Sequence, residues 1–102
     1  MFTSWYNTGF QITLPNHITV SVQFGPGNYC DNRDTETTWN NPSGIYKCAN
    51  AEVAIIDSLN GYWLTNQCWR EVFNEELTDD VVGFTTSEQL IPILNWASTY
   101  SH

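Results

Sequence analysis

Three cysteines and two histidines are the residues of this chain that could carry nucleophilic chemistry. A cysteine nucleophile needs a nearby base, usually a histidine. His17 falls in a turn predicted between two strands, and Cys30 follows the far end of the second strand. The extended residues 18–23 separate the two by roughly 20 Å. His102 is expected to lie free of the fold. We therefore predict no catalytic residue and no enzymatic activity.

The same cysteines are poorly spaced for a metal. Cys30, Cys48 and Cys68 are 18 and 20 residues apart, whereas structural zinc sites usually begin with a closely spaced C-x2-C pair. The acidic residues 75–80 lack the spacing and the glycine of a calcium-binding loop. No glycine-rich phosphate-binding motif is present in the sequence. We therefore expect no metal and no cofactor.

Two polar stretches are candidates for a binding surface, and the first is "FGPGNYCDNR", residues 24–33. It can be a strand-ending turn, in which aspartate and asparagine side chains bond to nearby backbone groups. It can also be a recognition loop, because tyrosine offers rigid contact area and asparagine offers adaptable hydrogen bonds. Both interpretations stay open at this point. The candidate partner-binding residues here are Tyr29, Asp31, Asn32 and Arg33.

The second stretch is the acidic segment "EVFNEELTDD", residues 71–80. Its candidate partner-binding residues are Glu71, Glu75, Glu76, Asp79 and Asp80. The whole chain has 3 cations against 11 acids, which gives a net charge of −8. We do not expect it to bind nucleic acid or an anionic membrane directly, because both contacts require cations. The segment is either a solvated loop that favours solubility or a patch that meets a basic partner.

Length and composition predict a single domain covering residues 1–102. Hydrophobic residues make up 41% of the chain and aromatic residues 15%, which is enough for one core. The odd number of cysteines, the lack of a signal-peptide pattern and the lack of a long apolar run favour a cytoplasmic protein with free thiols. We expect residues 1–9 and 99–102 to be flexible ends.

Hydrophobic periodicity predicts the elements of the first half. Apolar and polar residues alternate along "FQITLPNHITVSVQF", residues 10–24, which is typical of a β-hairpin. His17 occupies a turn position that suits glycine. Residues 25–50 look irregular, and "AEVAIID", residues 51–57, reads as a central strand. The pair Asn60–Gly61 predicts a two-residue turn, with another strand starting near Tyr62.

The second half closes with a helix. "TNQCWREVFNEEL", residues 65–77, fits either a short helix or a strand, and residues 81–84 fit one more short strand. Ser87 or Thr86 can cap a following helix, which Pro92 should bend. Its apolar stripe comprises Leu90, Ile91, Leu94 and Ala97. The sequence thus predicts an α+β fold, an antiparallel sheet of about four to five strands with a C-terminal helix packed on one face.

The order of three segments resembles small acidic proteins encoded by phages and prophages. The segments are "ITLPNHITVSVQFGPGNYCDNR", "AEVAIID" and "DVVGFTTSEQLIPILNWAS", within residues 10–98. In those proteins a hairpin leads into a G-x-G-N-Y-C-x-N-R loop, a strand and a closing helix. His17 departs from the pattern, which has glycine in the first turn. The resemblance implies an accessory protein of viral origin, a class that often inhibits host enzymes or immune systems, and it carries no catalytic assignment.

These observations lead to a hypothesis and an alternative. The hypothesis is a non-catalytic acidic protein of phage type that inhibits a host protein with a basic surface, for example an anti-CRISPR or anti-restriction factor in the host cytoplasm. Opposite charges would steer the encounter, and added salt would weaken it. The alternative is a module that binds a small nucleotide signal, with Arg33 or Lys47 on the phosphate. Formation of a homo-oligomer is also possible, since an interface between copies would bring the few cations together around the phosphate.

Overall fold

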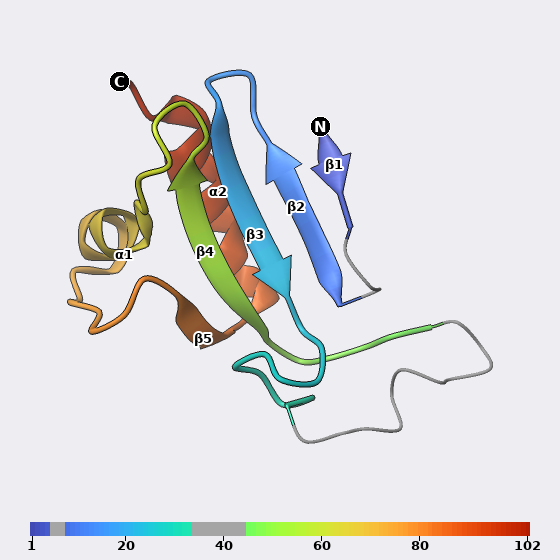
Figure 1. Cartoon of the computed structure of the whole chain (residues 1–102). Coiled ribbons are helices and arrows are strands. Elements are labelled where there is room, and N and C mark those ends of the chain that lie inside the picture. Colours follow the sequence, from blue (N-terminus) through green and yellow to red (C-terminus); the bar gives the residue numbers. More distant parts are fainter. Residues whose placement is uncertain (5–7, 34–44) are drawn as a thin grey trace.

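The computed structural model describes residues 1–4, 8–33 and 45–102. The elements in chain order are β1 (Phe2–Thr3), β2 (Gly9–Thr13), β3 (Ile18–Gln23), β4 (Ala51–Asp57), α1 (Thr65–Phe73), β5 (Val82–Thr85) and α2 (Ser87–Thr99). The strands form one antiparallel sheet in the order β1-β2-β3-β4-β5. Helix α2 crosses behind this sheet (Figure 1). The predicted α+β fold is confirmed.

The core lies between the central strands and the two helices. Val20 of β3 pairs with Ile55 of β4 in the sheet, and both side chains are fully buried. Ile93 and Ala97 of α2 join the same buried cluster, together with Trp69 of α1. Because these apolar side chains share one face of β3 and β4, both helices must cover that face.

The first hairpin has the predicted form. Leu14 N–H donates to the carbonyl of Ile18 at 2.9 Å, which closes the turn between β2 and β3. His17 has a φ of 67°, in the left-handed region that favours glycine. On the sheet face away from the helices, the hydroxyls of Thr13 and Thr19 lie 2.9 Å apart.

Helix α2 begins as predicted, at a side-chain cap. The Thr86 hydroxyl accepts from Gln89 N–H, and the Gln89 side chain accepts from Thr86 N–H at 3.0 Å, a reciprocal capping box. The predicted apolar stripe is wrong at Ile91, which is 63% exposed. Ile93 takes its place, because positions 90, 93, 94 and 97 lie on one helical face. In the part of the chain that the structure describes, no helix is long and apolar enough to span a membrane.

The predicted second hairpin is mostly wrong. Gly61 does make a turn, with a φ of 78°, but only Trp63 then pairs, with Ile56 of β4. Helix α1 begins two residues later, so the segment that fitted either a helix or a strand is a helix over Thr65–Phe73. The Thr65 hydroxyl accepts from Ile55 N–H at 3.0 Å. This bond, with Cys68 buried one turn further on, docks the chain onto β4 as a helix.

Both ends of the chain make contacts that we did not expect. Phe2 and Thr3 pair with β2 as an edge strand, and the Met1 amino group donates to the carbonyl of Thr13 at 2.9 Å. At the other end, His102 Nε2 lies 3.1 Å from Asp57 Oδ2. The flexibility of residues 1–9 and 99–102 stays a prediction, and these contacts are ones that the sequence did not indicate.

Replacing His17 with glycine should stabilise the protein. A side chain held in the left-handed conformation costs about 1 kcal/mol, and His17 is exposed, so its loss removes little packing. We expect the free energy of unfolding in urea to rise by roughly 0.5–1 kcal/mol. His17→Ala keeps a Cβ atom at this position and should give no gain. Equal stabilisation by both substitutions would contradict this account of the turn.

Candidate functional site

The loop that follows β3 is a tight turn held by two asparagine side chains. Asn28 Oδ1 accepts from Gly25 N–H at 2.9 Å. Asn32 Nδ2 donates to the carbonyls of Phe24 and Lys47, at 3.0 and 2.9 Å. The amide of Asn32 thus braces the loop against the segment before β4. Asn32 therefore fits the interpretation of this loop as a strand-ending turn, in which side chains bond to nearby backbone groups.

The other three candidates of this loop, Tyr29, Asp31 and Arg33, are exposed. The Arg33 guanidinium carbon lies 4.6 Å from the centre of the Tyr29 ring, a cation–π contact. The backbone N–H groups of Tyr29 and Asp31 donate to the side chains of Glu52 and Asn50, each at 2.9 Å. The backbone is therefore fixed by hydrogen bonds while these side chains face outward.

Strand β5 places Phe84 beside this loop. Phe84 N–H donates to the carbonyl of Tyr29 at 2.9 Å. Phe84 has a φ of 54°, although it is a bulky residue, and its side chain is 53% exposed. The register of β4 with β5 is irregular between Ala51 and Val53. A strained backbone that holds an apolar ring in solvent is typical of a functional site.

Gly83 permits the close contact between β5 and the loop. A Cβ atom at Gly83 would lie 2.7 Å from Tyr29 Cβ, which is too close for any other residue without a shift of the backbone. Sequence reasoning did not single out Gly83 or Phe84. The available signal was the glycine inside the short apolar run "VVGF", since a glycine within a strand often marks a bulge or a close backbone approach.

Three of the predicted acidic residues contact other side chains. Trp96 Nε1 donates to Glu71 Oε1 at 3.4 Å, and Trp69 Nε1 donates to Glu75 Oε2 at 3.3 Å. These two carboxylates help to join the helices and the segment that follows α1. Glu76 lies 4.0 Å from Arg70, and both side chains are exposed, so this ion pair adds little stability.

Asp79 and Asp80 connect the acidic segment to the loop. Both are exposed and directly precede Val81 and β5. The loop after β3 and strand β5 lie at the same end of the sheet (Figure 1). The two stretches that the sequence offered as separate candidates therefore meet at one strand. We call the residues Tyr29, Arg33, Asp79, Asp80 and Phe84 the β5 surface.

A cavity of about 410 Å³ lies next to the same end of the sheet. Val22, Val53 and Leu90 give it apolar walls, and Lys47 adds a cation. Thr85 also lines it, and its buried hydroxyl oxygen has no hydrogen-bond partner among the described residues. The volume is within the usual range for a small-molecule site.

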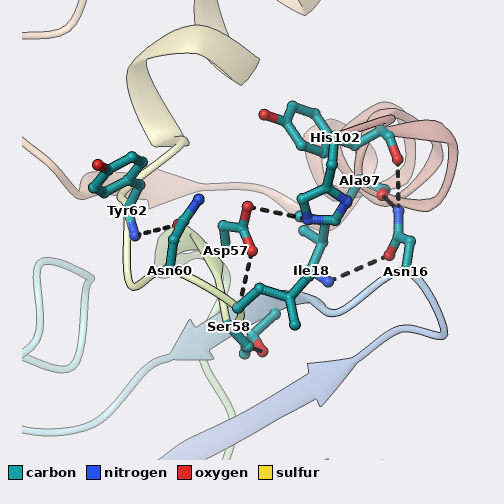
Figure 2. Close-up of polar contacts among 11 residues, drawn as sticks. Asn16, Ile18, Asp57, Ser58, Asn60, Tyr62, Ala97 and His102 are labelled. Atoms are coloured by element: carbon teal, nitrogen blue, oxygen red, sulfur yellow. Dashed lines mark hydrogen bonds and ion pairs between the residues drawn. The ribbon is translucent and has the colours of Figure 1, made fainter.

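A second polar cluster lies at the opposite end of β4 (Figure 2). The Asp57 side chain is 2% exposed and contacts His102. Asn16, in the turn of the first hairpin, donates to the carbonyls of Ala97 and Tyr100, at 2.8 and 3.1 Å. The Ala97 carbonyl also accepts from Tyr100 N–H at 3.4 Å, and Asn16 adds side-chain bonds at the C-terminal end of α2, where backbone carbonyls lack helical partners. The cluster thus fastens the end of α2 to the sheet.

Asp57 was not a candidate residue, and His102 was set aside as a base because it was expected to lie free of the fold; the two are 45 positions apart in the sequence. Burial raises the pKa of Asp57, but the hydrogen bond from Leu59 N–H and the contact with His102 outweigh it, so the pKa is below its usual value. An aspartate–histidine pair can orient a general base. The His102 ring also contacts the Tyr100 ring edge to face, with the ring centroids 5.4 Å apart.

The three cysteines are free thiols. Burial raises the pKa of Cys30 to about 11 and that of Cys68 to about 12, so both are poor nucleophiles at neutral pH. Cys30 and Cys48 lie together, and Cys68 lies apart in α1. Among the described residues, no group of three or more His, Cys, Asp or Glu could hold a metal ion.

Comparison of the chain with protein-family models, curated proteins and solved structures finds no match in any of the three. A function for the chain therefore has to be inferred from the geometry of its described residues. Among these residues are an exposed aromatic and acidic surface, a cavity, and a buried carboxylate that contacts His102.

Replacing Asp57 with asparagine should lower stability in a pH-dependent way. Folding lowers the pKa of Asp57, so its carboxylate stabilises the native state above the unfolded value, about 3.9. This contribution is lost as the pH falls through the lower native pKa. We expect thermal unfolding to show a clearly lower Tm for Asp57→Asn at pH 7 and a smaller difference near pH 3. The exposed control Asp31→Asn should change little. A difference that stays constant with pH would contradict this role.

Proposed function

We propose that this protein acts by binding a partner protein through the β5 surface. The observation that carries the proposal is Phe84, an exposed phenylalanine held at a φ of 54° beside Tyr29. Strain of this kind persists only where the surrounding structure enforces it. Aromatic residues near the centre of an interface supply much of its binding energy. Phe84 and Tyr29 would be the anchors, and Arg33 would hold the Tyr29 ring.

The acidic charge of this protein indicates that its partner has a basic surface. Asp79 and Asp80 are exposed and precede β5, the strand that carries Phe84, and the chain as a whole carries a net charge of −8. A partner with a basic surface would be drawn to this side, because opposite potentials raise the rate of encounter. Glu76 would extend the acidic rim, while Glu71 and Glu75 are engaged by tryptophan side chains. Nucleic acid and anionic membranes would be repelled.

We propose further that the protein is of phage type, as the order of its sequence segments led us to expect. A basic surface on a host protein often serves to bind nucleic acid. An acidic protein that covers such a surface would block it without any catalytic step. We propose inhibition of a host enzyme or defence complex, in the cytoplasm of the host, as the outcome of binding.

Replacing Phe84 with glycine should weaken binding while keeping the fold. Glycine accepts the left-handed backbone at no cost, which offsets the loss of a half-exposed ring, so stability should change by no more than about 1 kcal/mol. We expect affinity for a purified partner, first captured from bacterial lysate, to fall about tenfold or more. Calorimetry or surface plasmon resonance would measure it.

The matched control is Phe2→Ala. Phe2 is also an exposed phenylalanine on an edge strand, at the other side of the sheet. It should bind the partner as well as the unmodified protein. If Phe84→Gly kept full affinity, or if Phe2→Ala lost as much, the β5 surface would not be the binding surface.

The cavity supports a second candidate, the binding of a small nucleotide. Its apolar walls would suit a base, and Lys47, which lines it, would meet a phosphate. Arg33, the other cation considered for this role, stacks on Tyr29 instead. The buried hydroxyl of Thr85 without a partner among the described residues is the specific observation in its favour, since buried polar groups are normally satisfied.

A thermal-shift measurement with adenosine and guanosine monophosphates tests this candidate. A ligand that binds only the native state raises Tm as its concentration increases. We expect a rise that Lys47→Gln reduces and Arg33→Gln leaves in place. No shift at millimolar nucleotide, or an equal shift in Lys47→Gln, would remove the cavity from consideration as a nucleotide site.

A further inference from the structure

Cys30 and Cys48 lie side by side, although 18 positions separate them in the sequence. Burial raises the pKa of Cys30, and the neighbouring Cys48 side chain raises it further. Two hydrogen bonds hold the loop that contains Cys30 against the segment that contains Cys48. Asp31 N–H donates to Asn50 Oδ1 at 2.9 Å, and Asn32 Nδ2 donates to the carbonyl of Lys47 at 2.9 Å. The pairing of the thiols is therefore built into the packing of the loop against the segment before β4.

The two thiols differ in their access to solvent. Cys30 is 1% exposed and its thiol donates to the carbonyl of Gly25 at 3.6 Å. Cys48 is half-buried and lines the cavity of about 410 Å³. A small reagent that enters the cavity would therefore meet Cys48 first and Cys30 second. This is the arrangement of an attacking thiol backed by a resolving thiol.

We propose that Cys30 and Cys48 form a reversible dithiol–disulfide site that is oxidised by small disulfides such as glutathione disulfide. Cys48 Sγ loses its proton to solvent and attacks one sulfur of the oxidant, which breaks that disulfide and releases one glutathione thiol. Cys30 Sγ then attacks Cys48 Sγ and releases the second glutathione thiol. Two protein S–H bonds are lost, one S–S bond forms, and the oxidant is reduced to two thiols.

The structure also indicates what oxidation would do. The new bond would close the loop of residues 31–47, and such a closure stabilises a protein by restricting its unfolded state. The hydrogen bonds of Asp31 and Asn32 hold the two segments against each other in the reduced protein. The burial that raises the pKa of Cys30 also predicts that its step is the slow one and that it runs faster as the pH rises.

The test uses the isolated full chain, so it stands separately from partner binding. The reduced protein is titrated with glutathione disulfide, unfolded in an alkylating reagent, and digested without reduction for mass spectrometry. We expect one peptide pair joined through Cys30 and Cys48, reversed by dithiothreitol, with Cys68 alkylated. We also expect an upward shift in Tm on the order of 10 °C for the oxidised protein.

Variants separate the site from general oxidation. Cys48→Ser changes a half-buried position and should show neither the cross-link nor the shift in Tm. Cys68→Ala should keep both the cross-link and the shift in Tm. If that variant does not fold, the peptide map of the unmodified protein still shows whether Cys68 takes part in the cross-link. A lasting glutathione adduct on Cys48, a dimer joined through Cys48, or a cross-link without any rise in Tm would each overturn the proposal.

Discussion

Burial of one face of the β3–β4 pair is the constraint on which the rest of the structure depends. Val20 and Ile55 sit opposite each other at its centre and are fully buried. Helices α1 and α2 have to cover this face, so the chain between β4 and α2 must leave the sheet and return to it. Strand β5 is the point of return, at the free edge of β4. The position of the β5 surface is thus a consequence of how the core is closed.

The two ends of β4 are fastened by different chemistry. At one end the buried Asp57 contacts Leu59 and His102, and Asn16 bonds to the carbonyls at the end of α2. At the other end, the hydrogen bond from Asn32 to the carbonyl of Lys47 joins the loop after β3 to the segment before β4. The hydrogen bond from Phe84 N–H to the carbonyl of Tyr29 joins the same loop to β5. The first end is polar and closed, which suits stability. The second carries exposed aromatic rings, a cavity and a thiol pair, which suits interaction with other molecules.

Regular periodicity made much of the fold predictable from sequence. The alternation in residues 10–24 and the capped helix after Thr86 are local patterns, and both are confirmed. Helix α1 was ambiguous because its identity depends on Thr65 docking to Ile55, a contact outside its own segment. Phe84 was not singled out, since the hydrogen bond that joins it to the carbonyl of Tyr29 connects residues far apart in the sequence. The pairing of Cys30 with Cys48 and of Asp57 with His102 likewise depends on contacts far apart in sequence.

The central claim is that an acidic and aromatic surface at β5 captures a basic partner protein. The most direct measurement is the association rate of the complex over a salt series, for the unmodified protein and for Asp79→Asn/Asp80→Asn. Screening by salt weakens attraction between exposed charges, so the unmodified protein should associate more slowly as salt rises, and the variant should start slower and respond less. The exposed acid Glu88 of α2, changed to glutamine, is the matched control and should behave as the unmodified protein does. An association rate that is insensitive to salt, or equal in the double variant, would contradict the account.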